Sequence, residues 1–141
     1  MPEPSPGRPD QRYLYEIATN LYTFAATIPV TLTLAAPEPS EPQNVLLHKI
    51  AQAWVEMLGG IPPPSTCPDN VYLQNIAQNL TALTPAVVAQ GRPDQVYAYI
   101  IASQLYTYGL ANALALVFPP PDQGEPINSL YMKISSLTFE L

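Results

Sequence analysis

A hydrophobic pattern that begins with proline recurs five times along the 141 residues of the chain. In each copy an amide follows the proline by two residues, an apolar residue follows by four and an isoleucine by eight. The prolines are Pro9, Pro42, Pro68, Pro93 and Pro126, and the amides are Gln11, Asn44, Asn70, Gln95 and Asn128. The apolar residues are Tyr13, Leu46, Tyr72, Tyr97 and Leu130, and the isoleucines are Ile17, Ile50, Ile76, Ile101 and Ile134. This pattern predicts that one local helix is used five times.

The spacing within each copy is typical of a helix with one buried face. Proline is favoured at the first helical position, where its missing N–H would have no partner. At about 100° per residue, positions four, eight, twelve and fifteen after the proline share a face. In the first, second and fourth copies these are Tyr13, Ile17, Leu21 and Phe24; Leu46, Ile50, Trp54 and Met57; and Tyr97, Ile101, Leu105 and Tyr108. We expect this face to form the core, with Ala18, Ala51, Ala77 and Ala102 at position nine letting helices approach.

The five amides fall at the predicted third helical position. There an amide can bond back to the backbone N–H of the capping residue, as in a capping box. We prefer this interpretation to the alternative, a ladder of amides that faces a partner. Asp10, Asp69 and Asp94 fall at the predicted second helical position, where the helix dipole favours a carboxylate.

Two linkers differ from ordinary loops. Residues 28–36 alternate apolar residues with threonine, and residues 110–118 are apolar apart from Asn112. Each fits a short strand, and two such strands could pair. The second segment could instead prolong the preceding helix, because Ala and Leu favour helix. Residues 135–141 also alternate, so we expect the fifth helix to be short.

The first and fourth copies are the most alike. Residues 7–11 recur identically at 91–95, and the second and fifth copies share an entry of Glu followed by Pro. We infer that a unit of helix, linker and helix at 7–60 was duplicated as 91–141, with the third copy between them. The predicted fold is mainly α with short strands in the two linkers. Residues 7–141 form a single helical-repeat domain, and residues 1–6 form a flexible N-terminal arm.

The composition indicates a protein whose surface is largely covered by other subunits. Only 11% of residues are charged, against roughly 25% in ordinary soluble proteins. Because a monomer relies on surface charge to stay dispersed, we expect partner subunits to cover much of this chain. The net charge of −6 leaves no basic stripe for nucleic acid. The chain has no signal pattern and no apolar stretch long enough for a membrane span, so we expect a soluble cytoplasmic product.

The residues capable of chemistry are few and isolated. His48 lies off the core face, and we expect it to be a solvated surface residue. We expect Cys67 to be a free thiol or, alternatively, to form an intermolecular disulfide. Nucleotide-binding loops, nucleophile elbows and paired metal-ligand motifs are absent from the sequence. We therefore expect no enzymatic activity, no cofactor, no metal and no small-molecule substrate.

A second aromatic line lies roughly 140° around the helix from the core face. It consists of Tyr15, Tyr22, Tyr99 and Tyr106, with Gln11 and Gln95 on the same side. Either the first and fourth helices are central within their own domain, or this line is an interface, where tyrosine is enriched. These six residues are our candidate interface.

Residues 45–54, with the sequence VLLHKIAQAW, resemble the short LLxxIA helices of small structural proteins of tailed bacteriophages. Residues 128–137 are a looser version. The resemblance implies a non-enzymatic subunit of a head, neck, tail or fibre, assembled in the host cytoplasm, that contacts itself or other structural proteins in the virion. The alternative is a small helical binding module whose apolar groove accepts a hydrophobic ligand or a partner helix.

Overall fold

The structure is a computed structural model that describes residues 7–141; the predicted N-terminal arm, 1–6, lies outside the described residues. It contains five α-helices. They are α1 (Asp10–Thr27), α2 (Gln43–Leu58), α3 (Asp69–Asn79), α4 (Asp94–Ala111) and α5 (Ile127–Phe139), with a 3-10 turn, Leu80–Ala82, after α3. The prediction of a mainly helical, single compact domain is confirmed.

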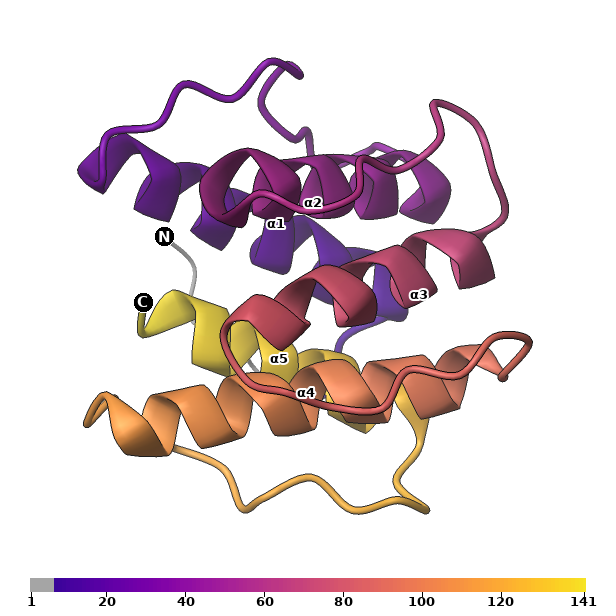
Figure 1. The fold of residues 1–141 in the computed structure, drawn as a ribbon, viewed down its shortest axis with the longest axis vertical. Coiled ribbons are helices and arrows are strands. Elements are labelled where there is room, and N and C mark those ends of the chain that lie inside the picture. The colour runs from indigo at the N-terminus through magenta and orange to yellow at the C-terminus, as the bar shows by residue number, and fades with distance from the viewer. Residues whose placement is uncertain (1–6) are drawn as a thin grey trace.

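The helices form a closed ring in which all five run in the same direction (Figure 1). Each helix packs against its neighbours in the chain, and α5 packs against α1 to close the ring. Because parallel neighbours need a connection that returns the whole helix length, long extended segments carry the chain back along the outside. These return segments are residues 28–42, 59–68, 83–93 and 112–126.

Every helix begins one residue later than predicted. The five prolines have extended backbones, with ψ between 149° and 158°, and precede the first helical residue. Pro9 O, for example, accepts hydrogen bonds from Arg12 N and Tyr13 N at 3.0 and 3.2 Å. Proline is therefore the N-cap residue, and Asp10, Asp69 and Asp94 occupy the first helical position.

The core contains the predicted face and a second row beside it. Positions four, eight and twelve after the proline are buried in all five repeats, and position nine is a buried Ala or, in α5, Ser135. Position fifteen is only half-buried. Position five, which we did not predict, is also buried: Leu14, Leu47, Leu73, Ala98 and Tyr131. Each helix needs two buried rows because it contacts two neighbours in the ring.

The predicted strands are not seen anywhere in residues 7–141. Leu110 and Ala111 complete α4, as the alternative interpretation allowed, and the rest of 110–118 and all of 28–36 are irregular. These segments lie on helices, whose backbone groups are already bonded, so they have no ladder partner. The alternation in 28–36 instead reflects packing: Leu32 and Leu34 are half-buried, and Thr31 and Thr33 are exposed.

The end of the chain is helical rather than strand-like. α5 has 13 residues, which makes it shorter than every helix of residues 7–141 except α3. Ser135, Ser136 and Thr138 are buried. Asn20 of α1 donates to Ser135 O at 3.0 Å and to Thr138 Oγ1 at 3.1 Å, so the alternation places polar groups at the seam where the ring closes.

Candidate interaction surface

The five repeated amides join the N-terminal ends of the helices in a ring. Each amide N–H₂ group donates to the backbone carbonyl of the residue just before the next proline, and α5 connects in this way to α1. The five bonds are Gln11 to Glu41 (2.9 Å), Asn44 to Cys67 (2.9 Å), Asn70 to Arg92 (2.6 Å), Gln95 to Glu125 (2.8 Å) and Asn128 to Arg8 (2.8 Å). The capping interpretation that we preferred is therefore wrong, and the N–H₂ groups bond within the chain.

A second hydrogen bond from each amide explains the choice between Asn and Gln. The three asparagines also donate to the aspartate that starts the next helix, from Asn44 to Asp69, Asn70 to Asp94 and Asn128 to Asp10. The next helix after Gln11 or Gln95 has no such aspartate, and these longer side chains reach Pro39 O and Gln123 O instead. The N–H groups of the two glutamines are therefore used within the chain.

The two tyrosines at position thirteen support the return segments of their own chain. The Tyr22 hydroxyl donates to Leu34 O at 3.1 Å. Burial, with the nearby carboxylates of Glu56 and Glu41, raises the pKa of Tyr22 to about 12. Tyr106 lines a small cavity together with residues 117–119 and Pro121. The predicted second aromatic line is thus half-buried beneath extended segments at these two positions.

The two tyrosines at position six have different surroundings. Tyr15 packs beneath the guanidinium of Arg12, which lies 5.3 Å from the ring centre. Tyr99 borders a groove of about 190 Å³ between residues 84–86 and the outer side of α4. The structure therefore separates the six residues of the candidate interface, and only Tyr99 lines this groove.

The groove beside Tyr99 is lined entirely by uncharged residues. Its lining residues are Thr84, Pro85, Ala86, Tyr99, Ile100, Ser103, Gln104 and Thr107. Gln104 is only 2% exposed, and its Nε2 donates to Ala77 O at 3.0 Å. Its Oε1 is buried and has no hydrogen-bond donor among the described residues. This acceptor lies beneath the wall of the groove, out of reach of solvent.

We name the surroundings of this groove the α4 face and define it by Val87, Tyr99, Thr107, Leu110 and Val117. No Asp, Glu, Lys or Arg occurs from residue 95 to residue 121. Val87, Leu110 and Val117 are 90%, 59% and 66% exposed. The return segments that carry Val87 and Val117 run along α4 on either side of its outer surface (Figure 1). The low overall charge is evident from the composition, but we did not predict the position of this uncharged stretch, which a plot of charge along the chain would have indicated.

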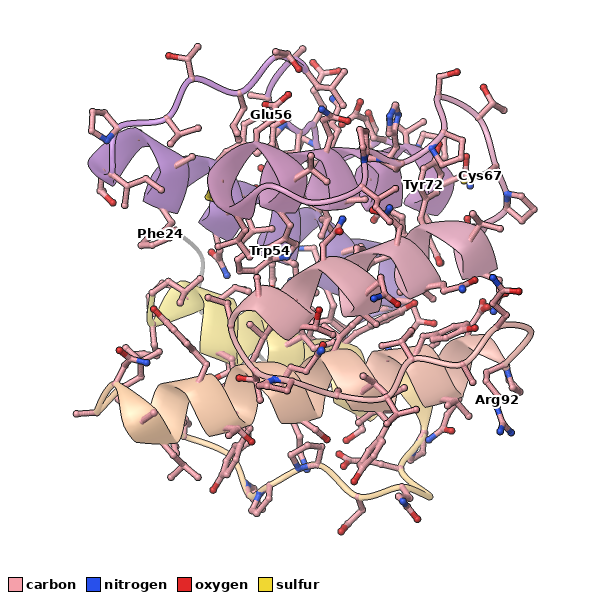
Figure 2. The ribbon with its side chains drawn as sticks, viewed as in Figure 1. Phe24, Trp54, Glu56, Cys67, Tyr72 and Arg92 are labelled. Carbon is pink, nitrogen blue, oxygen red and sulfur yellow. The ribbon has the colours of Figure 1, made fainter. Side chains whose placement is uncertain are left out.

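The residues capable of chemistry serve structural contacts. His48 is half-buried and stacks on Tyr72, with ring centres 5.2 Å apart, so the expectation of a solvated histidine was wrong. Cys67 lies close to Tyr72 at the N-terminal end of the bundle, where Arg92 points away from the body (Figure 2). Burial raises the pKa of the Cys67 thiol, which lowers its reactivity at neutral pH. Residues 7–141 hold no group of three side chains that could bind a metal ion.

The middle of the ring is filled by side chains. A cavity of about 20 Å³ remains there, lined by residues from all five helices, among them Leu14, Trp54 and Tyr131. Trp54 extends from α2 into the space between the helices (Figure 2). A water molecule needs roughly 10–15 Å³, whereas ligand pockets measure roughly 300–1,000 Å³. The centre therefore has room for about one water and none for an organic ligand.

Comparison with known proteins leaves the surface as the main guide to function. No protein-family model matches the sequence, and no curated protein or solved structure is significantly similar to it. Across the described helices, none is both long and apolar enough to cross a membrane.

Proposed function

We propose that this protein is a non-enzymatic structural subunit that self-associates through the α4 face as part of a larger assembly. The observation that carries the proposal is the uncharged α4 face with its three exposed aliphatic side chains. Charged residues are depleted at the centres of protein interfaces, and exposed aliphatic side chains on an uncharged face favour contact with another protein. A folded monomer with such a face gains free energy when another protein surface removes it from water.

The contrast between α4 and α1 supports this assignment. These helices start with nearly the same sequence, but α1 carries Asp10, Arg12 and Glu16, whereas Asp94 is the only charged residue of α4. A helix that is apolar on all sides is typical of a fully buried helix. Among the described helices α4 packs against α3, α5 and the 3-10 turn, and the return segments cover part of its outer side. A further subunit would cover the remainder.

The closed ring suits a structural role. Five amide links and a filled centre hold the helices together, and the proline-rich return segments are stiff before any partner binds. Docking a stiff surface costs less conformational entropy than ordering a flexible one. For the alternative, a binding module whose apolar groove accepts a hydrophobic ligand or a partner helix, the centre of the ring offers no site, because its cavity is too small for a ligand.

The virion is the assembly that the sequence favours. The resemblance of residues 45–54 to phage LLxxIA helices supports a head, neck, tail or fibre subunit assembled in the host cytoplasm. In the structure Leu46, Leu47, Ile50 and Ala51 are core residues of α2. The resemblance therefore concerns how the helix packs, and the α4 face supplies the contact.

We also infer that residues 7–60 and 91–141 arose by duplication. Equivalent ion pairs support the inference: Lys49 Nζ lies 2.7 Å from Glu41, and Lys133 Nζ lies 2.8 Å from Glu125. In both cases the lysine also donates to a carbonyl 13 residues earlier, Ala36 O or Pro120 O. Conserving such a three-group contact in both halves is more readily explained by copying than by chance.

Light scattering across a concentration series tests the proposed self-association. We expect the wild-type protein to form a discrete oligomer and Val117→Glu to shift it towards monomer. Ile61→Glu is the matched control, because Ile61 is 65% exposed and lies outside the α4 face, against 66% for Val117. A wild-type monomer at every concentration, or equal effects of the two variants, would contradict the proposal.

A further inference from the structure

The end of α4 differs from the ends of the three helices before it. A proline or glycine follows shortly after each of those helices, at Pro29, Gly59 and Pro85. After α4 the next such residue is Pro119. The residues before it, 112–118 with the sequence NALALVF, are rich in Ala and Leu, which favour helix. We call residues 112–118 the hinge, and α4 ends where this sequence would allow the helix to continue.

The chain turns away from α4 at Ala113, whose backbone is strained. Its φ is +56°, and no other residue of 7–141 apart from glycine has a positive φ. Leu114 N donates to Gly109 O at 3.0 Å, which is the bond of a helix stop that usually has glycine in the left-handed position. Alanine costs free energy in this position because its Cβ crowds the following carbonyl oxygen. A helical hinge would release this strain.

The helix that follows the hinge is held partly by polar contacts. Positions nine and twelve after the proline are Ala and Leu or Trp in the other four repeats, but Ser135 and Thr138 in α5. Both residues bond to α1. Asn20 Nδ2 donates to Thr138 Oγ1 at 3.1 Å, and Ser135 Oγ donates to Glu16 Oε1 at 3.1 Å. At these two positions α5 therefore buries less apolar surface than the other helices do.

We propose that two copies of the chain exchange α5. The hinge of each copy continues α4 as a helix, and its α5 fills the place between α4 and α1 of the other ring. The contacts of α5 are kept, now between two chains, while both copies of Ala113 become helical. Exchange of an identical element is a low-cost route to a dimer, and a strained hinge favours it. The inference rests on the proposed self-association and adds to it the segment that passes between the copies.

The direction of the helices makes this exchange compatible with contact through the α4 face. Because all five helices are parallel, residues 112–126 return the full length of α4 before α5 begins (Figure 1). For the 18 residues of α4 this length is about 27 Å. In a twofold pair with antiparallel α4 helices, the end of one α4 lies near the start of the other copy's α5, so the connection no longer returns along its own helix. Leu110 and Val117, which are 59% and 66% exposed in the single chain, then lie against the other copy.

Two variants of the hinge change the strain in opposite directions. Ala113→Gly removes it from the closed ring and weakens the helical hinge, so the dimer association constant should fall by about 10-fold or more, since each dimer has two hinges. Ala113→Val should raise the constant, because a β-branched residue avoids positive φ. Ala111→Gly is the matched control, since Ala111 is exposed and is helical in both forms. Light scattering measures the constant, and circular dichroism verifies the helical content.

A crosslinking experiment shows directly which chain supplies α5. Asn128 of α5 donates to Asp10 of α1 at 2.6 Å. We would refold together two single-cysteine chains, one with Asp10→Cys and one with Asn128→Cys, both with Cys67→Ser, and add a short bismaleimide. Exchange should give a crosslinked dimer on a denaturing gel. Asn44→Cys with Asp69→Cys is the matched control and should give none, because the equivalent link between α2 and α3 stays within one chain.

The outcomes separate the two proposals. A wild-type monomer at every concentration would overturn self-association and exchange together. A wild-type oligomer that gives no crosslink between Asp10→Cys and Asn128→Cys would overturn only the exchange and leave the α4 face as the interface. A crosslink in the control pair as well would reject α5 as the exchanged segment. Equal effects of Ala113→Gly and Ala111→Gly would reject the strained hinge as its cause.

Discussion

The residue that shapes this molecule most is the amide two positions after each proline. Its side chain connects one repeat to the next, and its length matches the start of the following helix. Asn70 reaches Arg92 O and Asp94, whereas Gln95 reaches two backbone carbonyls ahead of α5. A single polar residue thus sets the register between neighbouring helices that are parallel.

Asn70→Ala should lower the free energy of unfolding by about 1–3 kcal/mol, because two hydrogen bonds disappear and Asp94 loses its donor. Chemical denaturation measures the change. Gln74→Ala, a half-buried residue of the same helix for which no side-chain bond occurs within residues 7–141, is the control. Equal losses for the two variants would show that the amide link contributes nothing.

Asn70→Asp tests the same link by charge. The new carboxylate would face Asp94, which accepts from the present amide at 2.9 Å. Repulsion between two carboxylates raises the folded-state pKa of the pair, so the variant should be least stable at neutral pH and recover as the pair protonates. Unfolding at pH 7 and pH 4 measures this, and a variant that loses stability on acidification relative to wild type would refute the arrangement.

The two ion pairs predict how stability depends on pH. Burial alone would raise the pKa of Glu41, but the hydrogen bonds from Lys49 and from the backbone of Glu38 outweigh it and lower that pKa below 4.5. For Glu125, the bonds from Lys133 and Ser129 likewise outweigh burial and lower the pKa. A lowered folded-state pKa stabilises the protein above pH 4.5, and this contribution is lost as the pH falls through the folded value.

Lys49→Met should therefore cost about 1–3 kcal/mol at pH 7, because it leaves a half-buried carboxylate without its partner. Thermal or chemical unfolding as a function of pH measures the difference from wild type. It should shrink below pH 4.5, where Glu41 protonates. Lys133→Met should behave alike because its contacts are equivalent, and a pH-independent cost in both variants would assign the effect to packing alone.

At the scale of elements, the return segments are held by side chains rather than by strand pairing. Asn79 bonds both the N–H and the carbonyl of Ile61, and Tyr22 bonds Leu34 O. Extended segments on a helical surface have no neighbouring strand to complete their backbone bonds. Asparagine, glutamine and tyrosine side chains, together with solvent, take over that role.

Gly60→Ala should destabilise the link between α2 and α3. Gly60 has φ of +116°, and an added Cβ would lie 2.4 Å from Asn79 Oδ1. We expect a loss of about 1–3 kcal/mol from backbone strain and displacement of Asn79. Gly124→Ala is the control, because nothing lies within 4 Å of the added atom there. Similar denaturation midpoints for both variants would contradict this expectation.

Tyr22→Phe separates the two accounts of the second aromatic line. If Tyr22 supports its own return segment, the variant loses the bond to Leu34 O, about 1 kcal/mol of stability, and keeps its oligomer mass. Denaturation and light scattering on the same sample give both readouts. A lower oligomer mass at unchanged stability would instead show that the Tyr22 hydroxyl contacts a partner.

At the scale of the whole molecule, the closed ring means that the chain termini could lie at any of the five connections between helices. The seam between α5 and α1 carries the same kind of amide link as the other four, from Asn128 to Arg8 O and Asp10. Each helix therefore meets two neighbours in the same way, whichever connection is covalent. Such a ring differs from an open array of repeats, whose end units have only one neighbour.

A circular permutant should therefore fold. Joining Leu141 to Met1 places ten residues between α5 and Pro9, against nine residues, 59–67, between α2 and Pro68. We would open the chain between Ala35 and Ala36, which are exposed, so that Leu34 O and Ala36 O keep their bonds. Stability should stay within about 2 kcal/mol of wild type, since comparable loop lengths differ little in closure entropy. An unfolded permutant by circular dichroism would show that the α5 to α1 seam is not equivalent to the others.

The sequence by itself determined the five helix starts, to within one residue, and the row of buried residues from Tyr13 to Leu21. These follow from proline chemistry and helical periodicity, which act within one turn or a few. Only the tertiary structure decided the second buried row, the targets of the amides and the groove beside Gln104. The reason is physical: these features depend on which helix lies alongside, and that neighbour is 22 to 120 residues away along the chain. The prediction of strands in the two linkers was wrong for the same reason. An extended segment that packs on a helix shows the same alternation of apolar and polar residues as a strand in a sheet.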